Sequence, residues 1–331
     1  MSNEAKFLVT SATGNTGYQV AIQLLEKGEN VRVMSRSYGV IIKELESKGA
    51  EVVVGNISKR NDMEKALSGI NRVYYCYPIV PKLLASTKML IEIAKQENIE
   101  TVVNLGQYLA ELESHPSKQT NEHRLAYKEL DDASIGAIHV TPGWFADNLM
   151  NTALFISQFG RVPFPLGKGR SPIVSNEDIA AVVVSLLREP QGHEGKRFQP
   201  TGPKSLSMNE MMQTFEKVLG RKVKQLPMPR FLFNKAIIQM GFPEYLLSQL
   251  NFYVDDFQNG EFDYEPNDVV LQLTGRNPES FDVTAKRYFE KDNLMKRSSS
   301  GVWKAFKQFM MIGFTKAPGS KALEKMNLKS Y

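Results

Sequence analysis

The stretch Phe7-Leu8-Val9-Thr10-Ser11-Ala12-Thr13-Gly14-Asn15-Thr16-Gly17-Tyr18 decides the fold of this chain. Its apolar start predicts a short buried strand, its small residues predict a turn, and a helical pattern follows to Glu26. Gly28 ends that helix, and Val31 and Val33 alternate as a second strand. A strand, a turn, a helix and a second strand form a βαβ unit, whose first turn is a candidate phosphate-binding site.

The glycines of this turn have separate tasks. A spacing of G-x-x-G-x-x-G would place glycines at 11, 14 and 17, and the first of these positions holds Ser11. Gly14 lets the backbone approach a pyrophosphate, and Gly17 lets the helix pack closely on the strand. The N–H groups and the dipole of the helix would then face the anion. A glycine-rich turn that only connects two elements is the alternative.

The end of the second strand bears on the choice of cofactor. Enzymes that select NAD place an acidic residue there, against the ribose hydroxyl. This chain has Met34-Ser35-Arg36-Ser37 instead, with no acid. The planar guanidinium of Arg36 suits a phosphate on that ribose, although a solvated surface arginine is the plain alternative. We therefore expect NADP(H) to be favoured over NAD(H).

The next part of the chain continues to alternate between strands and helices. Strands are predicted at 51–56, 72–78, 101–106 and 138–143, and the clearest helices between them at 62–67 and 83–96. This alternation predicts an α/β fold with a doubly wound parallel sheet. Ligands of such sheets bind beyond the carboxyl ends of the strands, so the turns after the strands should line the cleft.

Composition and charge set outer limits. Of the 331 residues, 42% are hydrophobic and 23% charged, as in ordinary globular proteins. Cys76 is the only cysteine, which excludes an intrachain disulfide and fits a reducing compartment. The N-terminus has no apolar signal region, and we expect a cytoplasmic protein. No His/Cys cluster has zinc spacing, so no metal site is expected.

Several stretches resemble, in the right order, the NmrA-like family of atypical short-chain dehydrogenase/reductases. They are the 10–17 turn with Arg36, the segment Thr141-Pro142-Gly143-Trp144-Phe145-Ala146-Asp147-Asn148-Leu149, Val174-Ser175-Asn176-Glu177-Asp178-Ile179-Ala180, Arg197-Phe198-Gln199-Pro200-Thr201-Gly202-Pro203 and Leu273-Thr274-Gly275-Arg276-Asn277-Pro278. The resemblance implies a Rossmann domain over 1–150 and a smaller, interleaved α/β substrate domain over 151–290. It also implies that residues 174–202 return in part to the Rossmann sheet.

The resemblance and the turn positions together predict the ligand contacts. The cofactor residues are Thr10, Ser11, Thr13, Gly14, Asn15, Thr16, Gly17, Arg36, Asn56, Ile57, Pro78, Gly106, Pro142 and Gly143. The substrate pocket would be lined by Tyr77, Gln107, Tyr108, Trp144 and Phe145.

The usual catalytic triad of short-chain reductases is missing. Those enzymes use Ser, Tyr and a Lys four residues after the Tyr, and the Lys lowers the Tyr pKa so that it donates a proton. Here Gly106-Gln107-Tyr108 stands where the Ser is expected, and Asp131 follows four residues after Tyr127. The segment 121–128 resembles the family's stretch at the active-site helix, and this resemblance makes His123, Tyr127 and Lys128 the candidate proton donors. A structural histidine and a solvated lysine are the alternatives for His123 and Lys128.

Residues 291–331 form a basic tail. It holds nine Lys or Arg residues against Asp292 and Glu324, a net charge of +7, so the rest of the chain carries −2 of the total +5. The body therefore gives no reason to expect nucleic acid. After the linker-like Ser298-Ser299-Ser300-Gly301, residues 302–314 predict a basic amphipathic helix. We expect it to dock on the protein itself, ahead of a partner or a membrane surface.

Two functions remain open at this point. The first is an NADPH-dependent reductase of a small carbonyl or quinone, which the aromatic residues of the predicted pocket favour. The second is an NADP(H) redox sensor that regulates a protein partner, which the missing triad favours. Turnover of NADPH distinguishes them.

Overall fold

The computed structural model describes residues 6–328, which divide into two compact units. Unit 1 comprises the residues up to 142 together with 176–200 and 268–277, and unit 2 comprises 143–175, 201–267 and the residues from 278 onward. The chain thus leaves unit 1 and returns to it twice. The return over 268–277 was not anticipated from the sequence.

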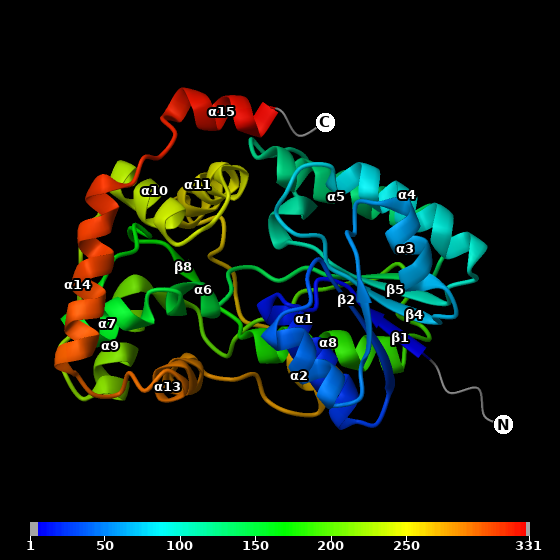
Figure 1. Cartoon of the computed structure of the whole chain (residues 1–331), viewed down its shortest axis with the longest axis horizontal. Helices are drawn as coiled ribbons and strands as arrows, with labels where there is room; N and C mark the ends of the chain where they lie inside the picture. The colour runs from blue at the N-terminus through cyan, green and yellow to red at the C-terminus, as the bar shows by residue number, and fades with distance from the viewer. Residues whose placement is uncertain (1–5, 329–331) are drawn as a thin grey trace. The chain divides into compact units, whose positions relative to one another are not determined.

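Unit 1 is built on a parallel seven-stranded sheet with the order β3-β2-β1-β4-β5-β6-β9 (Figure 1). Its strands are β1 (Lys6–Val9), β2 (Asn30–Ser35), β3 (Glu51–Val54), β4 (Arg72–Tyr75), β5 (Thr101–Leu105), β6 (Ala137–Val140) and β9 (Arg197–Phe198). The register pairs Phe7 with Val31 on one side of β1 and with Arg72 on the other. The strand order therefore reverses direction at β1, where doubly wound sheets bind their ligands.

Two groups of helices accompany this sheet. One contains α1, α2, α8 and α12, and the other contains α3, α4 and α5, with contacts within each group. Their bounds are α1 (Asn15–Glu26), α2 (Val40–Ser47), α3 (Arg60–Leu67), α4 (Leu83–Gln96), the short 3-10 turn η1 (Tyr108–Glu111), α5 (Lys118–Asp131), α8 (Asn176–Arg188) and α12 (Val269–Thr274). The α/β fold with a doubly wound parallel sheet, predicted from the sequence, is confirmed.

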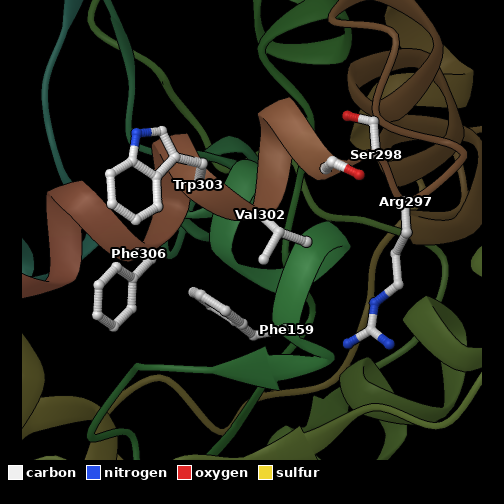
Figure 2. Close-up of a pocket in the computed structure, with 7 residues that line it drawn as sticks. Phe159, Arg297, Ser298, Val302, Trp303 and Phe306 are labelled. Atoms are coloured by element: carbon white, nitrogen blue, oxygen red, sulfur yellow. The ribbon is translucent and has the colours of Figure 1, made fainter.

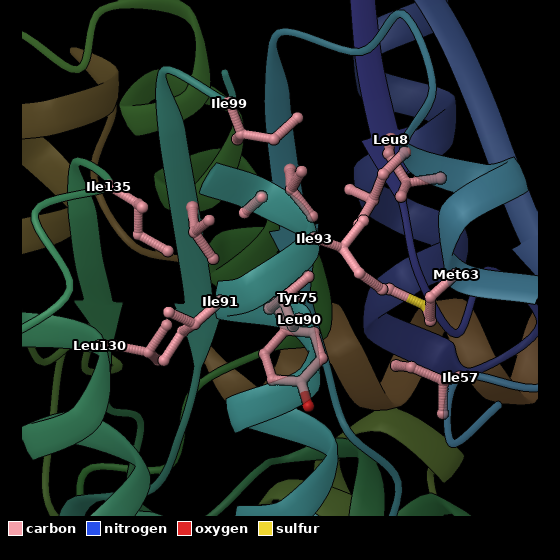
Figure 3. Packing of buried hydrophobic residues seen from close by; sticks show 14 of the residues in the cluster. Leu8, Ile57, Met63, Tyr75, Leu90, Ile91, Ile93, Ile99, Leu130 and Ile135 are labelled. Carbon is pink, nitrogen blue, oxygen red and sulfur yellow. The ribbon is translucent and has the colours of Figure 1, made fainter. Parts of the chain in front are cut away.

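A continuous apolar core fills the space between the sheet and α3–α5 (Figure 3). Leu8 of β1 and Tyr75 of β4 lie in the same cluster as Leu90 and Ile93 of α4. Burial of these side chains stabilises the sheet at about 25 cal/mol per Å² of apolar surface. The turns at the carboxyl ends of the strands are thereby held on a rigid frame.

Unit 2 is mostly helical. Its elements are α6 (Asp147–Met150), α7 (Ala153–Phe159), β7 (Arg161–Val162), β8 (Arg170–Ser171), β10 (Leu206–Ser207), α9 (Met208–Leu219), β11 (Lys224–Gln225), α10 (Arg230–Gln239), α11 (Glu244–Asn259), α13 (Phe281–Lys291), α14 (Ser299–Phe314) and α15 (Ser320–Leu328). β8 pairs with β10 and β7 with β11. Over residues 6–328, no helix is both long and apolar enough to cross a membrane.

Local signals in unit 2 explain where its helices begin and end. Ser207 and Glu210 form a reciprocal capping box at the start of α9, and Gly220 ends it in the left-handed conformation. Ser298, expected in a linker, instead caps α14 by accepting a hydrogen bond from the Gly301 N–H at 3.0 Å. The linker expectation was wrong because three serines before an apolar run also make a helix N-terminus.

Candidate functional site

The turn between β1 and α1 has an unusual backbone. Ser11 adopts a positive φ of 50°, the left-handed conformation that favours glycine, at the position where the motif would have its first glycine. Its hydroxyl donates a hydrogen bond to the Cys76 carbonyl at 2.7 Å, and its carbonyl accepts one from the Gly14 N–H at 2.9 Å. These bonds fix the turn and offset the strain of a non-glycine residue there.

The two retained glycines both lie close to the Ser11 carbonyl oxygen, and the approach is prohibitive for a side chain only at Gly17. A Cβ on Gly17 would lie 2.4 Å from the Ser11 carbonyl oxygen, and one on Gly14 would lie 3.3 Å from the same atom. Gly17 therefore allows α1 to pack against the end of β1. Gly14 leaves an exposed stretch of backbone at the start of the helix, which a phosphate can approach.

The N-terminus of α1 is suited to an anion. No side chain caps the helix, and its first turn holds no acidic residue. The first helical hydrogen bond of this turn runs from the Tyr18 N–H to the Gly14 carbonyl at 2.9 Å. Thr13, Gly14 and Asn15 are exposed, so the N–H groups and the positive end of the helix dipole are directed at an accessible place. These features fit the pyrophosphate of a dinucleotide.

Two predicted cofactor residues, Thr10 and Thr16, use their hydroxyls inside the protein. The Thr10 hydroxyl accepts a hydrogen bond from the Cys76 N–H at 2.9 Å and donates one to the Tyr74 carbonyl at 3.0 Å. The Thr16 hydroxyl donates to the Asn176 side chain on α8 at 2.6 Å. Both residues are buried, so their hydroxyls support the turn through hydrogen bonds within the protein.

Arg36 lies exposed just beyond the end of β2. The Ser35 hydroxyl accepts a hydrogen bond from the Ser37 N–H at 3.4 Å and donates one to the Ser37 carbonyl at 3.0 Å. Within residues 6–328, no acidic side chain forms an ion pair with Arg36. Its guanidinium is therefore available to a phosphate placed beyond β2.

The turns after β3 and β4 are closed by their own side chains. The Asn56 side chain accepts a hydrogen bond from the Ser58 N–H at 2.9 Å, while the Asn56 N–H donates to Asp62 at 2.8 Å. Ile57 is buried, and Pro78 after β4 is half-buried. The Tyr77 hydroxyl donates to the Pro81 carbonyl at 2.8 Å, and its ring belongs to the apolar core.

The turn after β5 is bound to Tyr127 of α5. The Tyr127 hydroxyl accepts a hydrogen bond from the Gln107 N–H at 2.7 Å and donates one to the Gln107 carbonyl at 3.1 Å. A Cβ on Gly106 would lie 1.8 Å from this hydroxyl oxygen, so Gly106 is required for the contact. Tyr108 follows, and its N–H donates to the Pro142 carbonyl at 3.1 Å. Tyr127 thus holds this turn in place.

The other two candidate proton donors differ in their surroundings. His123 is buried on the same helix face as Tyr127, with ring centres 6.2 Å apart. Burial lowers the pKa of His123 to about 4, so its imidazole is neutral at pH 7. Lys128 is exposed on α5. A catalytic role for these three residues stays a prediction.

A polar network next to Tyr127 was not predicted from the sequence. The buried His139 of β6 bonds to Asp131 at 2.9 Å and to the Asn104 side chain at 3.2 Å, and Arg197 pairs with Asp131 at 2.8 Å. Burial lowers the pKa of His139 although Asp131 opposes the shift. The His139 ring lies 4.8 Å from that of Tyr127. The network links α5 to β6 and β9. Its one signal in the sequence was Asp131, which stands four residues after Tyr127, where the usual triad has its Lys.

Three predicted ligand residues belong to unit 2. Trp144 is 3% exposed and packs edge-on against Phe257 and Phe262, with ring centres 5.1 and 5.7 Å away. Phe145 is half-buried and forms a β-bridge with Val174. A Cβ on Gly143 would lie 1.8 Å from the Tyr264 hydroxyl. The structure thus gives Trp144 a packing role in unit 2, and contact of these residues with a ligand stays a prediction.

Neither a reactive thiol nor a metal cluster was found at the site. Burial raises the pKa of the Cys76 thiol to about 11, so it is protonated at neutral pH. Within the part of the chain that the structure describes, no group of His, Cys, Asp and Glu side chains could hold a metal ion.

Comparisons with known proteins agree with this geometry. The chain is 28% identical over 298 residues to an NAD(P)H azoreductase from Xenophilus azovorans, covering 85% of this chain and 97% of the relative. Its fold is similar to that of an NADPH-dependent quinone oxidoreductase from Escherichia coli complexed with NADPH, with a TM-score of 0.72, 20% identity and coverage of 86% and 99%. It is also similar to NmrA, a negative transcriptional regulator solved in complex with NADP, with a TM-score of 0.71, 15% identity and coverage of 87% and 97%. The model of the NmrA-like family matches residues 3–282, and the chain belongs to that family.

Proposed function

We propose that this protein is an NADPH-dependent reductase whose phosphate site is the turn between β1 and α1. The observation that carries the proposal is the exposed, uncapped N-terminus of α1 behind Gly14. The azoreductase and the quinone oxidoreductase, named for their use of NAD(P)H and NADPH, support it as relatives of the same family or fold.

Different residues of unit 1 would bind different parts of the cofactor. The N–H groups at the start of α1 would bind the pyrophosphate, and Arg36 would bind the ribose phosphate of NADP(H). NADPH, when bound, supplies a hydride. The half-buried Gln107 and Tyr108 follow β5 at the same edge of the sheet, and we propose them as contacts of the substrate.

The state of the candidate donors favours a quinone over a ketone or aldehyde. The Tyr127 hydroxyl bonds to both the N–H and the carbonyl of Gln107, and His123 is neutral at pH 7. Hydride addition to a quinone leaves a phenolate-type anion, which water can protonate because such hydroxyls have a pKa of about 10. Reduction of a ketone leaves an alkoxide, about as basic as hydroxide, which requires a positioned acid. We infer that the site suits a weakly basic product.

The same observations favour a second candidate, a redox sensor that binds NADP(H) and regulates a protein partner. A sensor needs the phosphate site but no proton donor. The NmrA regulator in complex with NADP supports this alternative as a similar fold.

Turnover separates the two candidates. Loss of NADPH absorbance would be followed with naphthoquinone and with benzaldehyde, for the wild type, His123→Ala and Tyr127→Phe. We expect faster turnover of naphthoquinone and less than about a threefold change in kcat for both variants, against the ~10²–10⁴ that loss of a positioned proton donor costs. A loss of that size in a folded Tyr127→Phe protein would make Tyr127 the donor. Binding of NADPH without any turnover would favour the sensor.

A further inference from the structure

The tail helix α14 packs along one side against other helices of unit 2. It contacts α7 and α10, its own Ala305 is fully buried, and its Phe309 ring lies 5.8 Å from that of Phe155 on α7. The Lys235 ammonium of α10 donates a hydrogen bond to the Gly313 carbonyl at 3.1 Å. The tail helix therefore docks on the protein itself, but this contact covers only one side of the helix.

A second side of α14, next to the docked one, is apolar and exposed. It presents Trp303, Phe306, Met310 and Phe314, which we call the α14 face, and the exposed fractions of Trp303 and Phe314 are 66% and 79%. The Trp303 and Phe306 rings stack with centres 5.8 Å apart. Together with Phe159 and Val302 they border an open hollow of about 660 Å³, which Figure 2 shows from close by. An outward side of this composition indicates an interaction surface.

The charge along the chain that carries the α14 face has one sign. Exposed lysines accompany the aromatic side chains on the helix, further cations lie before and after it, and residues 293–323 contain no Asp or Glu. The cations are Lys296, Arg297, Lys304, Lys307, Lys316 and Lys321. Aromatic side chains and methionines interleaved with lysines are typical of helices that lie in a membrane interface.

We propose that the α14 face binds the surface of an anionic lipid bilayer, with the helix lying in the plane of the membrane. The aromatic rings would enter the boundary between headgroups and acyl chains, and the lysines would contact lipid phosphates. Two copies of the face would repel each other, because each carries cations without acids. Lysine is also depleted in protein–protein interfaces. This inference is independent of the proposed function, because it uses no residue of unit 1.

The two tryptophans provide a direct measurement. The chain has two, and Trp144 is 3% exposed in the aromatic core of unit 2 while Trp303 is exposed on the α14 face. Tryptophan emission of the full chain would be titrated with vesicles of pure phosphatidylcholine and with vesicles containing phosphatidylglycerol, alongside co-sedimentation. We expect a blue shift and at least about tenfold stronger partitioning with the anionic vesicles, weakened by salt. No shift, or equal binding to both vesicles, would overturn the proposal.

Variants test whether both the lysines and the apolar side chains of α14 contribute to membrane binding. Lys304→Glu with Lys307→Glu should reduce partitioning to anionic vesicles at least about tenfold. Lys217→Glu with Lys286→Glu changes the charge equally on the exposed sides of α9 and α13 and should change partitioning less than about twofold. Phe314→Ser should weaken binding, whereas Val283→Ser, exposed on α13, should not. Equal effects of the two lysine pairs would contradict the assignment to α14. A blue shift that follows protein concentration without lipid would instead assign the face to a second copy.

Discussion

The turn after β1 and the turn after β5 lie at the same edge of one sheet, and they use their polar groups in opposite ways. The first leaves the start of α1 exposed, with no side-chain cap, and Ser11 fixes it through hydrogen bonds to the Gly14 N–H and the Cys76 carbonyl. The second is bound to α5 through the Tyr127 hydroxyl, and the nearby His123 is buried and neutral at pH 7. The comparison teaches that this unit leaves the start of α1 open to an anion, while two of the three candidate proton donors, Tyr127 and His123, are buried among contacts within the protein.

The first prediction breaks the turn after β1 by filling its closest contact. Gly17→Ala places a methyl group 2.4 Å from the Ser11 carbonyl oxygen, so α1 must move away from the end of β1. We expect the free energy of unfolding to fall by about 3 kcal/mol. Gly39→Ala is the matched control, because no atom lies within 4 Å of a Cβ there. Equal stability of the two variants in chemical denaturation would show that the close packing is not required.

The second prediction sharpens the account of α5. The folded pKa of His123, about 4, lies below the unfolded value near 6.5, so the unfolded chain binds more protons between these values. The free energy of unfolding therefore has its full value above pH 6.5. It falls by up to about 3 kcal/mol as the pH falls toward 4. His123→Leu should lack this loss. Denaturation of both proteins at pH 7 and pH 4 measures it, and an equal loss in the two would contradict the burial of a neutral imidazole.

The third prediction concerns the charge beyond β2. Arg36→Ala should weaken binding of NADPH by about 1–3 kcal/mol and leave NADH unchanged, because only NADPH carries the ribose phosphate. Arg161→Ala, another exposed arginine, is the matched control and should leave both affinities unchanged. Calorimetric titration of the wild type and both variants with each cofactor gives the six affinities. Equal affinity of the wild type for NADPH and NADH would remove the proposed role of Arg36.

Much of the fold could be predicted because its signals are local. Apolar runs, helix periodicity and glycine stops located the strands β1 to β6 and the helix α4, and for α4 the predicted and observed bounds are the same. The start and end of α9 are local signals of the same kind. The capping box lies within four consecutive residues, and Gly220 directly follows the helix. The return of 268–277 to unit 1 depends instead on contacts of α12 with α8, which no local pattern records.

The candidate site was predictable for its backbone and much less for its side chains. Gly14 and Gly17 follow from what a turn requires of its backbone. The state of Tyr127 does not, because its hydroxyl bonds to Gln107, twenty residues away in sequence. Nor does the pairing of Asp131 with His139 and Arg197, which joins three separate elements. Motif spacing shows which residue types stand at the candidate positions, but the partner of each polar atom depends on tertiary packing.

The binding of NADPH at the turn after β1 is the central claim, and calorimetric titration of the wild type and Gly14→Val tests it most directly. A valine at this exposed position would cover the backbone that the pyrophosphate approaches, and because its Cβ would lie 3.3 Å from the Ser11 carbonyl oxygen, the turn needs to shift by only a few tenths of an ångström. We predict that the wild type binds NADPH and that Gly14→Val does not, with unchanged circular dichroism. Wild-type affinity in a folded Gly14→Val protein would contradict the claim and reduce the turn to a connector.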